Sequence, residues 1–503
     1  MSNDTPHESL KQRVGEVIDL RAAIALLQWD QEVNMPPKAA EARGRQLATL
    51  SALAHERFTS PEMGQLVADA TSEAAALSYD ERRLVEETAH DYDKATKLPT
   101  SFVEKLAGAE SAAYEAWTRA RKESDFGLFK QHHAGIVELL RQKADYFGYQ
   151  DSPYDALLDE YERGMTTKAV REVFAELATE QSKLVAAIAK SGNQHDTAWL
   201  DQEYDEQAQW DFTLRVLRDM GYDFEAGRQD KSVHPFTTNF DLYDVRVTTR
   251  MDPRDPFSAL TGSMHEGGHA LYEQGFRPED RRTLLAEGVS LGIHESQSRM
   301  WENMIGRSLP FWRHYHHDFV RSHAPRLDQR TPEDLYRAIN RVEPSFIRVE
   351  ADECTYNLHI ILRFEIEVDL IEGRLRADEV PECWNAKVKQ YLGLDVPSDA
   401  LGCLQDIHWS HGAMGYFPTY ALGNLYAAQL FEQIERDLPG LWTDVERGDF
   451  APLLAWLREH VHRHGRRLLP AELIEKATGA KPTAKPYLSY LRRKYGMLYG
   501  LPA

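Results

Sequence analysis

The sequence has little cysteine and no long apolar run. Its 503 residues include only three cysteines, Cys354, Cys383 and Cys403, which form neither a paired framework nor a CxxC motif. A disulfide scaffold is therefore excluded. No apolar run approaches the roughly 20 residues that cross a membrane, and the polar opening residues lack the apolar core of a signal peptide. We therefore expect a cytoplasmic protein that has reduced thiols and no membrane partner.

Positive charge is scarce as well. Lys and Arg number 59 against 80 Asp and Glu, which gives a net charge of −21. Nucleic-acid binding depends on cationic contacts with phosphate, so no nucleic-acid partner is expected. Flexible linkers, low-complexity segments and repeats are also missing. Long amphipathic patterns with short breaks at Pro and Gly, such as residues 9–27, predict a predominantly helical body.

The most informative pattern is His265-Glu266-Gly267-Gly268-His269. Residues four apart on an α-helix lie one above the other, so both imidazoles point the same way. Two His at this spacing can hold one Zn²⁺, and the Glu between them can reach a water on the metal. The alternative is a surface helix that carries two His on one face.

The flanking residues favour the metal site. Asp255-Pro256 predicts an N-cap followed by the first helical residue, and Gly275 predicts the end of the helix. The apolar stripe between them is formed by Phe257, Leu260, Met264 and Leu271. Gly267 and Gly268 cost roughly 1 kcal/mol each inside a helix relative to Ala. We therefore expect a substrate or another backbone to lie close to this helix.

A working zinc site needs a third protein ligand and a position left for water. A third His six residues after the second is excluded, because that position is Gly275. The next predicted helix opens at residue 288 and should end near Gly306. The candidate ligands around it are Glu287, His294, Glu295 and Glu302. Glu295 is preferred because Ser298 and Arg299 follow at i+3 and i+4 and could hold its carboxylate, although spacing alone leaves the others open.

Further motifs accompany these two. In order along the chain they are His234-Pro235-Phe236, Asp244-x-Arg246-x-Thr248, His265-Glu266-x-x-His269, His294-Glu295-Ser296-Gln297, Ile347-Arg348-x-x-Ala351-Asp352 and Gly402-x-x-Gln405-Asp406-x-His408-Trp409. Together they resemble the carboxypeptidase Taq family of metallocarboxypeptidases. The resemblance implies a fold like that of neurolysin and angiotensin-converting enzyme, a deep groove, homodimers and release of C-terminal amino acids. It also implies that Glu295 is the third metal ligand.

The expected fold class is all-α, with a small β-hairpin or edge sheet near the active site. We expect residues 1–503 to form a single peptidase domain. Its N-terminal helical part, about 1–230, would form a groove wall or lid, and the catalytic part would be about 231–503.

A carboxypeptidase must recognise a free α-carboxylate, and a planar guanidinium can bind both of its oxygens. Arg348 is the first choice. Pro344-Ser345 predicts the start of its helix and Gly373 the end, so that Asp352 at i+4 would hold the guanidinium. The alternative is an ordinary Arg–Asp pair on a helix surface.

Residues 240–250 show the alternation of a strand, which places Asp244, Arg246 and Thr248 on one face. The edge of such a strand beside the metal could pair with a peptide backbone. Arg246 is then the second choice for the carboxylate. A structural Asp–Arg–Thr network in a hairpin is the alternative.

His408, Tyr416 and Tyr420 are candidate donors to the oxyanion of the tetrahedral intermediate, and Asp406 could orient His408. Removing one such donor costs roughly 10²–10³ in rate.

The sequence thus predicts a zinc carboxypeptidase that removes single residues, with broad specificity, from short peptides with a free C-terminus. One Zn²⁺ per chain would be held by His265, His269 and Glu295, and Co²⁺ could replace it. Glu266 would take a proton from the attacking water and deliver it to the leaving amine. Two alternatives remain: an endo-acting zinc oligopeptidase, and a non-catalytic helical binding protein with a structural metal.

Overall fold

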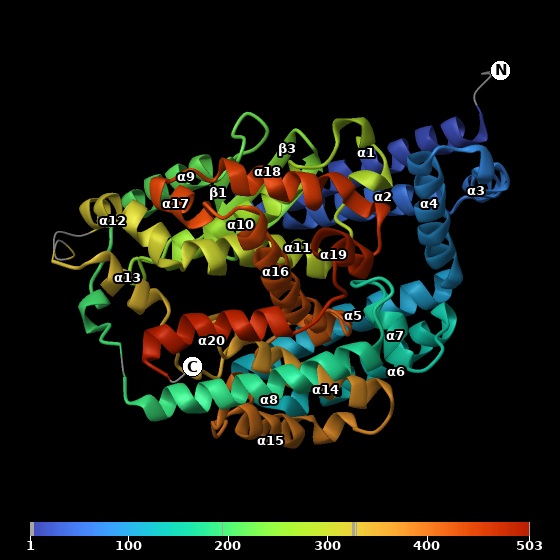
Figure 1. Cartoon of the computed structure of the whole chain (residues 1–503). Helices are drawn as coiled ribbons and strands as arrows, with labels where there is room; N and C mark the ends of the chain where they lie inside the picture. Colours follow the sequence, from blue (N-terminus) through green and yellow to red (C-terminus); the bar gives the residue numbers. More distant parts are fainter. Residues whose placement is uncertain (1–4, 194, 324–326, 328, 502–503) are drawn as a thin grey trace.

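Helices make up most of the chain in the computed structural model, which describes residues 5–193, 195–323, 327 and 329–501 (Figure 1). The helices before the sheet are α1 (Pro6–Val33), α2 (Ala40–Thr59), α3 (Pro61–Ser72), α4 (Tyr79–Lys97), α5 (Thr100–Glu123), α6 (Lys130–Phe147), α7 (Pro153–Leu158), α8 (Thr167–Ser191) and α9 (Glu206–Met220). The strands are β1 (Gln229–Lys231), β2 (Thr237–Asp241) and β3 (Asp244–Thr249).

The second part of the chain is again helical. Its helices are α10 (Ser258–Glu273), α11 (Leu291–Arg299) with the π-helical continuation η7 (Met300–Gly306), α12 (Leu309–His323), α13 (Pro332–Ile339), α14 (Tyr356–Ile371), α15 (Val380–Leu392), α16 (Phe417–Asp437), α17 (Leu441–Arg447), α18 (Ala451–His460), α19 (Pro470–Thr478) and α20 (Lys485–Tyr499). Among the described residues, no helix is both long enough and apolar enough to cross a membrane.

Helix α1 illustrates how local sequence sets the boundaries. Thr5 accepts a hydrogen bond from the Glu8 backbone, and the Glu8 carboxylate accepts one from the Thr5 backbone, so the two form a capping box. The amphipathic pattern predicted for residues 9–27 is confirmed within this helix. Its buried face contains Leu10, Val14 and Val17. Residues 1–4 of the polar opening segment lie outside the described residues.

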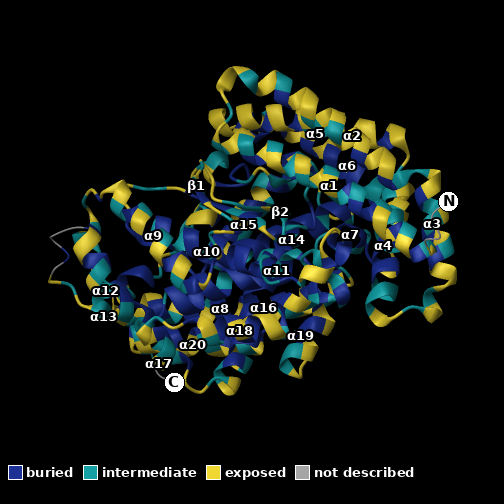
Figure 2. Ribbon diagram, turned by 90° about the horizontal axis from the view of Figure 1, so that it is seen from above, coloured by how far each residue is buried: buried dark blue, intermediate teal, exposed yellow. Residues whose placement is uncertain are grey.

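The centre of the molecule is a stack of helices. Helix α11 lies between α10 and α16, and α16 packs in turn on α14 and α20 (Figure 1). Figure 2 shows α10, α11 and α14 in the buried interior, while the outward faces of α2 and α5 are exposed. The main hydrophobic core draws on buried residues from Ala113 to Tyr499. A polar site on α10 and α11 is therefore enclosed by apolar packing.

Helices α1 to α4 bury a smaller hydrophobic cluster, to which Leu284 and Leu285 from the second part of the chain also belong. Ion pairs add to this contact. Arg467 donates from Nε to Asp80 at 2.8 Å, and Arg466 from Nη2 to Asp91 at 2.9 Å. The N-terminal helices are thus joined to the remainder by few apolar side chains and several charges.

The small sheet has the strand order β1-β3-β2. β1 pairs with β3 in parallel and β2 pairs with it antiparallel. β3 is therefore the central strand, so the expectation that residues 244–248 form a free edge is wrong. Its hydrogen-bonding groups are taken by neighbours on both sides. Both β1 and β2 are edge strands among the described residues, and β2 packs on α10.

Candidate metal and active site

The HExxH motif lies inside α10, but the helix starts later than the sequence predicts. The Oδ1 atom of Asp255 accepts hydrogen bonds from the backbone N–H groups of Phe257 (2.9 Å) and Ser258 (3.3 Å). Asp255 thus satisfies free donors at the helix start, as expected, although regular helix begins only at Ser258. The helix ends at Glu273, shortly before Gly275.

The two motif glycines allow other helices to approach α10. A Cβ on Gly268 would lie 2.7 Å from the carbonyl oxygen of Gln297 and 2.7 Å from Cα of Ser298, both on α11. A Cβ on Gly267 would lie 2.5 Å from Cδ2 of Leu217 on α9. The predicted close backbone approach is therefore present at Gly268, and the backbone belongs to the helix that carries Glu295.

Three side chains converge between α10 and α11. The Nε2 atoms of His265 and His269 each lie 3.5 Å from Oε2 of Glu295. One donor atom from each residue lies within 4.8 Å of the others. Glu295 is buried, at 6% exposure, while both imidazoles are partly exposed. Two imidazole nitrogens and a carboxylate oxygen arranged in this way fit the donor set of a catalytic zinc site.

The other candidate ligands lie outside this cluster. Oε2 of Glu302 lies 3.0 Å from Nδ1 of His265, on the far edge of that ring. His294 approaches the far edge of the His269 ring, with 2.6 Å between the two Nδ1 atoms. Glu287 is paired with an arginine near the C-terminus of the chain. Glu302 and His294 therefore contact the imidazoles on the side opposite to the metal position.

The surroundings of Glu295 and His269 favour the charge states that a metal requires. At His265, burial opposes protonation, but Glu295 and Glu302 outweigh it and raise the pKa. Arg299 donates from Nε to Oε1 of Glu295 at 2.7 Å, and Ser298 donates from Oγ to Oε2 at 3.2 Å. Burial raises the pKa of Glu295, but Arg299 and His265 more than offset it, and the pKa lies below its usual value. Burial lowers the pKa of His269 to about 3. An ionised carboxylate and a neutral imidazole are the metal-binding forms.

Glu266 lies between the two imidazoles along α10 and is 7% exposed. Thr237 of β2 donates from Oγ1 to its carboxylate oxygen Oε2 at 2.7 Å. Burial raises the pKa of Glu266 above its usual value. The sheet thus holds the acid–base candidate through its edge strand, a contact that the sequence did not indicate.

Arg348 lies in a single 3₁₀ turn, η9 (Arg348–Glu350), rather than in the predicted helix. The helix expected to start at Pro344-Ser345 begins only at Tyr356. Asp352 does not pair with Arg348: it accepts from the backbone of Thr355 and of Cys354 at the start of α14. The prediction was wrong because the i,i+4 proximity of the two side chains exists only within a helix.

The partner of Arg348 is Asp406. Nε and Nη2 of Arg348 donate to its Oδ1 at 3.0 and 2.9 Å, and Arg363 donates from Nε to Oδ2 at 2.8 Å. Arg348 also donates from Nη1 to the hydroxyl of Tyr356 at 3.2 Å. Arg348 is 6% exposed and Arg363 is fully buried. Two guanidinium groups therefore share one carboxylate inside the protein.

The β3 side chains form their own network. Arg246 donates from Nε and Nη2 to Asp244 at 2.7 and 2.8 Å, and its guanidinium lies 4.3 Å from the ring centroid of Trp29 on α1. Thr248 is buried and accepts from the backbone N–H of Phe236 at 2.9 Å. The Asp244–Arg246 pair is part of the structural network that the sequence left as an alternative, but Thr248 hydrogen-bonds to Phe236 and Ser232 instead of joining that pair.

His408 and the two tyrosines lie together beside Arg348. The hydroxyl of Tyr420 is 3.5 Å from Nε2 of His408, and the Tyr420 ring lies 5.0 Å from the Arg348 guanidinium. The ring centroids of Tyr416 and Tyr420 are 5.3 Å apart. Oδ1 of Asp406 is 4.0 Å from Nδ1 of His408, beyond hydrogen-bond length. Burial lowers the pKa of His408 to about 4, so the ring is neutral at pH 7.

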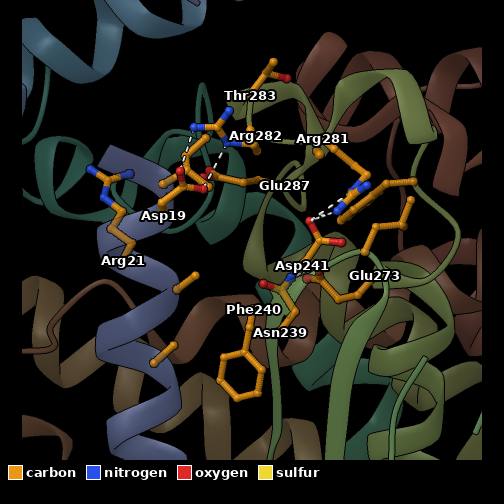
Figure 3. Close-up of a pocket in the computed structure, with 16 residues that line it drawn as sticks. Asp19, Arg21, Asn239, Phe240, Asp241, Glu273, Arg281, Arg282, Thr283 and Glu287 are labelled. Carbon is orange, nitrogen blue, oxygen red and sulfur yellow. Dashed lines mark hydrogen bonds and ion pairs between the residues drawn. The ribbon is translucent and has the colours of Figure 1, made fainter. Parts of the chain in front are cut away.

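A cavity of about 270 Å³ lies between α1 and β2 (Figure 3), and its lining includes neither the three side chains that converge between α10 and α11 nor Arg348. Asn239 and Glu273 line one side of it. Arg281 pairs with Asp241 and Arg282 with Asp19, as the dashed lines in Figure 3 show. Helix α1 therefore forms a wall beside the edge strand.

The sequence motifs did not single out Thr237, Tyr356 or Arg363, all of which contact the site. Arg363 lies 15 residues beyond Arg348 on a buried helix, where a charged residue in a strongly apolar stretch was an available signal. Thr237 and Tyr356 carry no such signal.

Comparison with known proteins defines the family. Residues 9–495 match the model of the carboxypeptidase Taq (M32) metallopeptidases. The chain belongs to this family. It is 40% identical over 477 residues to carboxypeptidase 1 of Bacillus subtilis, covering 95% of both chains. It is 41% identical to thermostable carboxypeptidase 1 of Thermus thermophilus, covering 99% of this chain and 100% of that one.

Solved structures support the same family assignment. The crystal structure of the M32 carboxypeptidase from Deinococcus radiodurans superimposes with a TM-score of 0.97 at 44% identity, covering 99% of this chain and 100% of that one. Metallocarboxypeptidase 1 of Trypanosoma cruzi gives a TM-score of 0.93 at 33% identity, covering 97% and 99%. The predicted family, helical fold and enzyme class are confirmed: the protein is a metallocarboxypeptidase, a metal-dependent hydrolase of peptides.

Proposed function

We propose that His265, His269 and Glu295 hold one zinc ion per chain and that Glu266 is the general base. The observation that carries this proposal is the convergence of three donor atoms within 4.8 Å, from two neighbouring helices. The donor set suits zinc and does not exclude cobalt. Zinc bound there would acidify a water molecule and polarise the scissile carbonyl.

Glu266 takes the proton of the attacking water and returns it to the leaving amine. Its place on α10 one residue after His265 keeps it next to the metal ligands, and the Thr237 hydrogen bond fixes the carboxylate. Burial raises the pKa of this carboxyl towards the range in which a group accepts and releases a proton at neutral pH.

Arg348 binds the terminal carboxylate of the substrate. Asp406 contacts only one side of its guanidinium through Oδ1, and Arg363 occupies the other carboxylate oxygen. Two cations against one anion leave a positive charge that a substrate carboxylate would balance. Arg246, the second choice, is neutralised by Asp244, which no second arginine pairs with among the described residues, and this difference favours Arg348.

His408, Tyr416 and Tyr420 are the proposed donors to the oxyanion. Neutral His408 and the Tyr420 hydroxyl lie beside Arg348, so a substrate bound by its terminal carboxylate would bring its last peptide bond near them. Each such donor is worth roughly 10²–10³ in rate.

A peptide backbone would be accommodated by the edge of β2, not of β3, because β3 has neighbours on both sides and β2 is the edge strand that contacts Glu266 through Thr237. Backbone pairing recognises peptides with little dependence on side chains, which supports broad specificity towards short peptides. We retain one peptidase domain over 1–503, with α1 as a groove wall, and a cytoplasmic homodimer as parts of the proposal. The cavity between α1 and β2 supports the proposed role of α1 as a groove wall.

Digestion of a peptide series, followed by mass spectrometry and metal analysis, tests the function. We expect successive losses of one residue from the C-terminus and one zinc per chain. An endo-acting oligopeptidase would release internal fragments and would cleave C-terminally amidated peptides equally well. A non-catalytic protein with a structural metal would release nothing, whether or not its metal is bound.

A further inference from the structure

His269 is supported from the side opposite to the metal position. Its Nε2 faces Oε2 of Glu295 at 3.5 Å, so its Nδ1 is the atom through which the protein can hold the ring. That atom lies 2.6 Å from Nδ1 of His294. Two imidazole nitrogens this close share one proton, with one as donor and the other as acceptor.

The direction of this hydrogen bond follows from the ligand role of His269. A nitrogen that binds a metal carries no proton, so His269 bears its proton on Nδ1 and donates it to His294. Because His294 accepts at Nδ1, its ring proton lies on Nε2, which is 2.6 Å from Oε1 of Glu273. The other oxygen of Glu273 accepts from the side-chain amide of Asn239 on β2. We call His294, Glu273 and Asn239 the His269 relay.

Packing keeps the middle ring of the relay in place. A Cβ on Gly288 would lie 2.8 Å from Cδ2 of His294, so only glycine leaves room for the ring there. The Tyr272 ring stands edge-on to it with centroids 5.1 Å apart. A ring held in this way cannot turn to offer its other nitrogen without displacing its neighbours.

The second imidazole ligand is supported differently. Nδ1 of His265 lies 3.0 Å from the Glu302 carboxylate, which Arg299 and Arg307 contact at 3.2 and 3.0 Å. His265 therefore has an ionised partner in direct contact, whereas His269 reaches its carboxylate through another imidazole. The supports of His265 and His269 can therefore be compared within one metal centre.

We propose that His294 and Glu273 are positioning residues of the metal centre, which fix the tautomer and orientation of His269 and anchor it to β2 through Asn239. The inference rests on the proposed role of His269 as a ligand. Asn239 and Glu273 lie at the cavity wall in Figure 3, so the relay links the metal centre to the strand that borders the proposed peptide site.

The test is the zinc dissociation constant of the apo-protein, measured by competition with a chromophoric chelator. Outer partners of ligating His change metal affinity by roughly 10–100-fold. We expect His294→Phe, which keeps the ring volume but removes both nitrogens, to weaken zinc binding by a factor in that range. Glu273→Gln should weaken it less, because the amide oxygen still accepts from His294. Glu279→Gln, an exposed residue paired with Arg277 nearby, should leave it unchanged.

A spectroscopic reading separates positioning from general damage. In the cobalt-substituted protein, the Nδ1 proton of His269 should give a shifted resonance that exchanges slowly with solvent, and His294→Phe should remove or displace it. Unchanged zinc affinity and an unchanged resonance in both His294→Phe and Glu273→Gln would overturn the relay. His269→Ala decides the ligand role independently: if it leaves zinc affinity intact, the proposed metal centre itself fails.

Discussion

Replacement of Arg348 by Ala should remove the preference for a free C-terminal carboxylate. The guanidinium is 6% exposed, and its interaction with a bound carboxylate would be a largely desolvated, charge-assisted contact. Removing one partner of a buried charge pair costs about 3–5 kcal/mol. That corresponds to a loss of roughly 10²–10⁴ in affinity for the free acid. For the C-terminal amide, which carries no charge, we expect little change.

The variant should remain folded. Asp406 keeps its ion pair with Arg363, which donates from Nε to Oδ2 at 2.8 Å, so no carboxylate is left buried and unpaired. Arg348→Lys should recover only part of the affinity, because an ammonium group keeps the charge but not the planar fork.

The assay is calorimetric binding of one peptide, as free acid and as amide, to the Glu266→Gln protein, in which turnover is suppressed. The acid-to-amide ratio of dissociation constants is compared with and without Arg348→Ala. Arg246→Ala is the matched control, since Asp244 and Trp29 already engage that guanidinium. A ratio that survives Arg348→Ala, or disappears in Arg246→Ala, would refute the reasoning.

Three further predictions concern Glu266, two buried carboxyl groups and Gly268. Glu266→Gln should lower kcat by roughly 10²–10⁴ while metal analysis still finds the ion bound; a variant with normal turnover would remove Glu266 from the mechanism. Burial raises the pKa of Glu162 and of Glu367 from 4.5 to about 7, so the stabilisation that each carboxyl contributes is full below pH 4.5 and is lost as the pH rises through about 7. Melting curves between pH 5 and 8 measure this effect. As the pH rises, the Tm of the wild type should fall relative to the Tm of Glu162→Gln and of Glu367→Gln. A Tm difference that does not depend on pH would contradict these pKa values. Gly268→Ala should weaken both stability and metal binding, because its methyl group would meet the α11 backbone at 2.7 Å. Thermal melting and chelator competition measure the two effects, and a variant unchanged in both would show that the helices separate easily.

The sequence predicted the part of the site that depends on local helix geometry. The i,i+4 spacing of His265 and His269 was sufficient once their segment was helical. The i+3 and i+4 positions of Ser298 and Arg299 likewise predicted their contacts with Glu295. In each case the partner lies within one helical turn, where spacing fixes distance.

The errors arose where the same reasoning was applied outside a helix. Asp352 was expected to hold Arg348, but the two residues are separated by a turn and not by a helix. Asp406, from a loop 58 positions beyond Arg348 in the chain, pairs with Arg348 instead. No local sequence pattern indicates a contact between residues so far apart in the chain. The central place of β3 was missed for a related reason, since alternation shows which face of a strand is buried but not how many neighbours the strand has.

The Arg348–Asp406–Arg363 cluster has a consequence for the end of the catalytic cycle. With Arg348 in its proposed role, a released amino acid would carry the same carboxylate that held the substrate, so the attraction that captures a peptide would also delay the departure of its last residue. The released amino acid differs from the bound peptide in its protonated amine, which would place a new positive charge near the buried guanidinium groups. Repulsion between them would help to clear the site for the shortened chain.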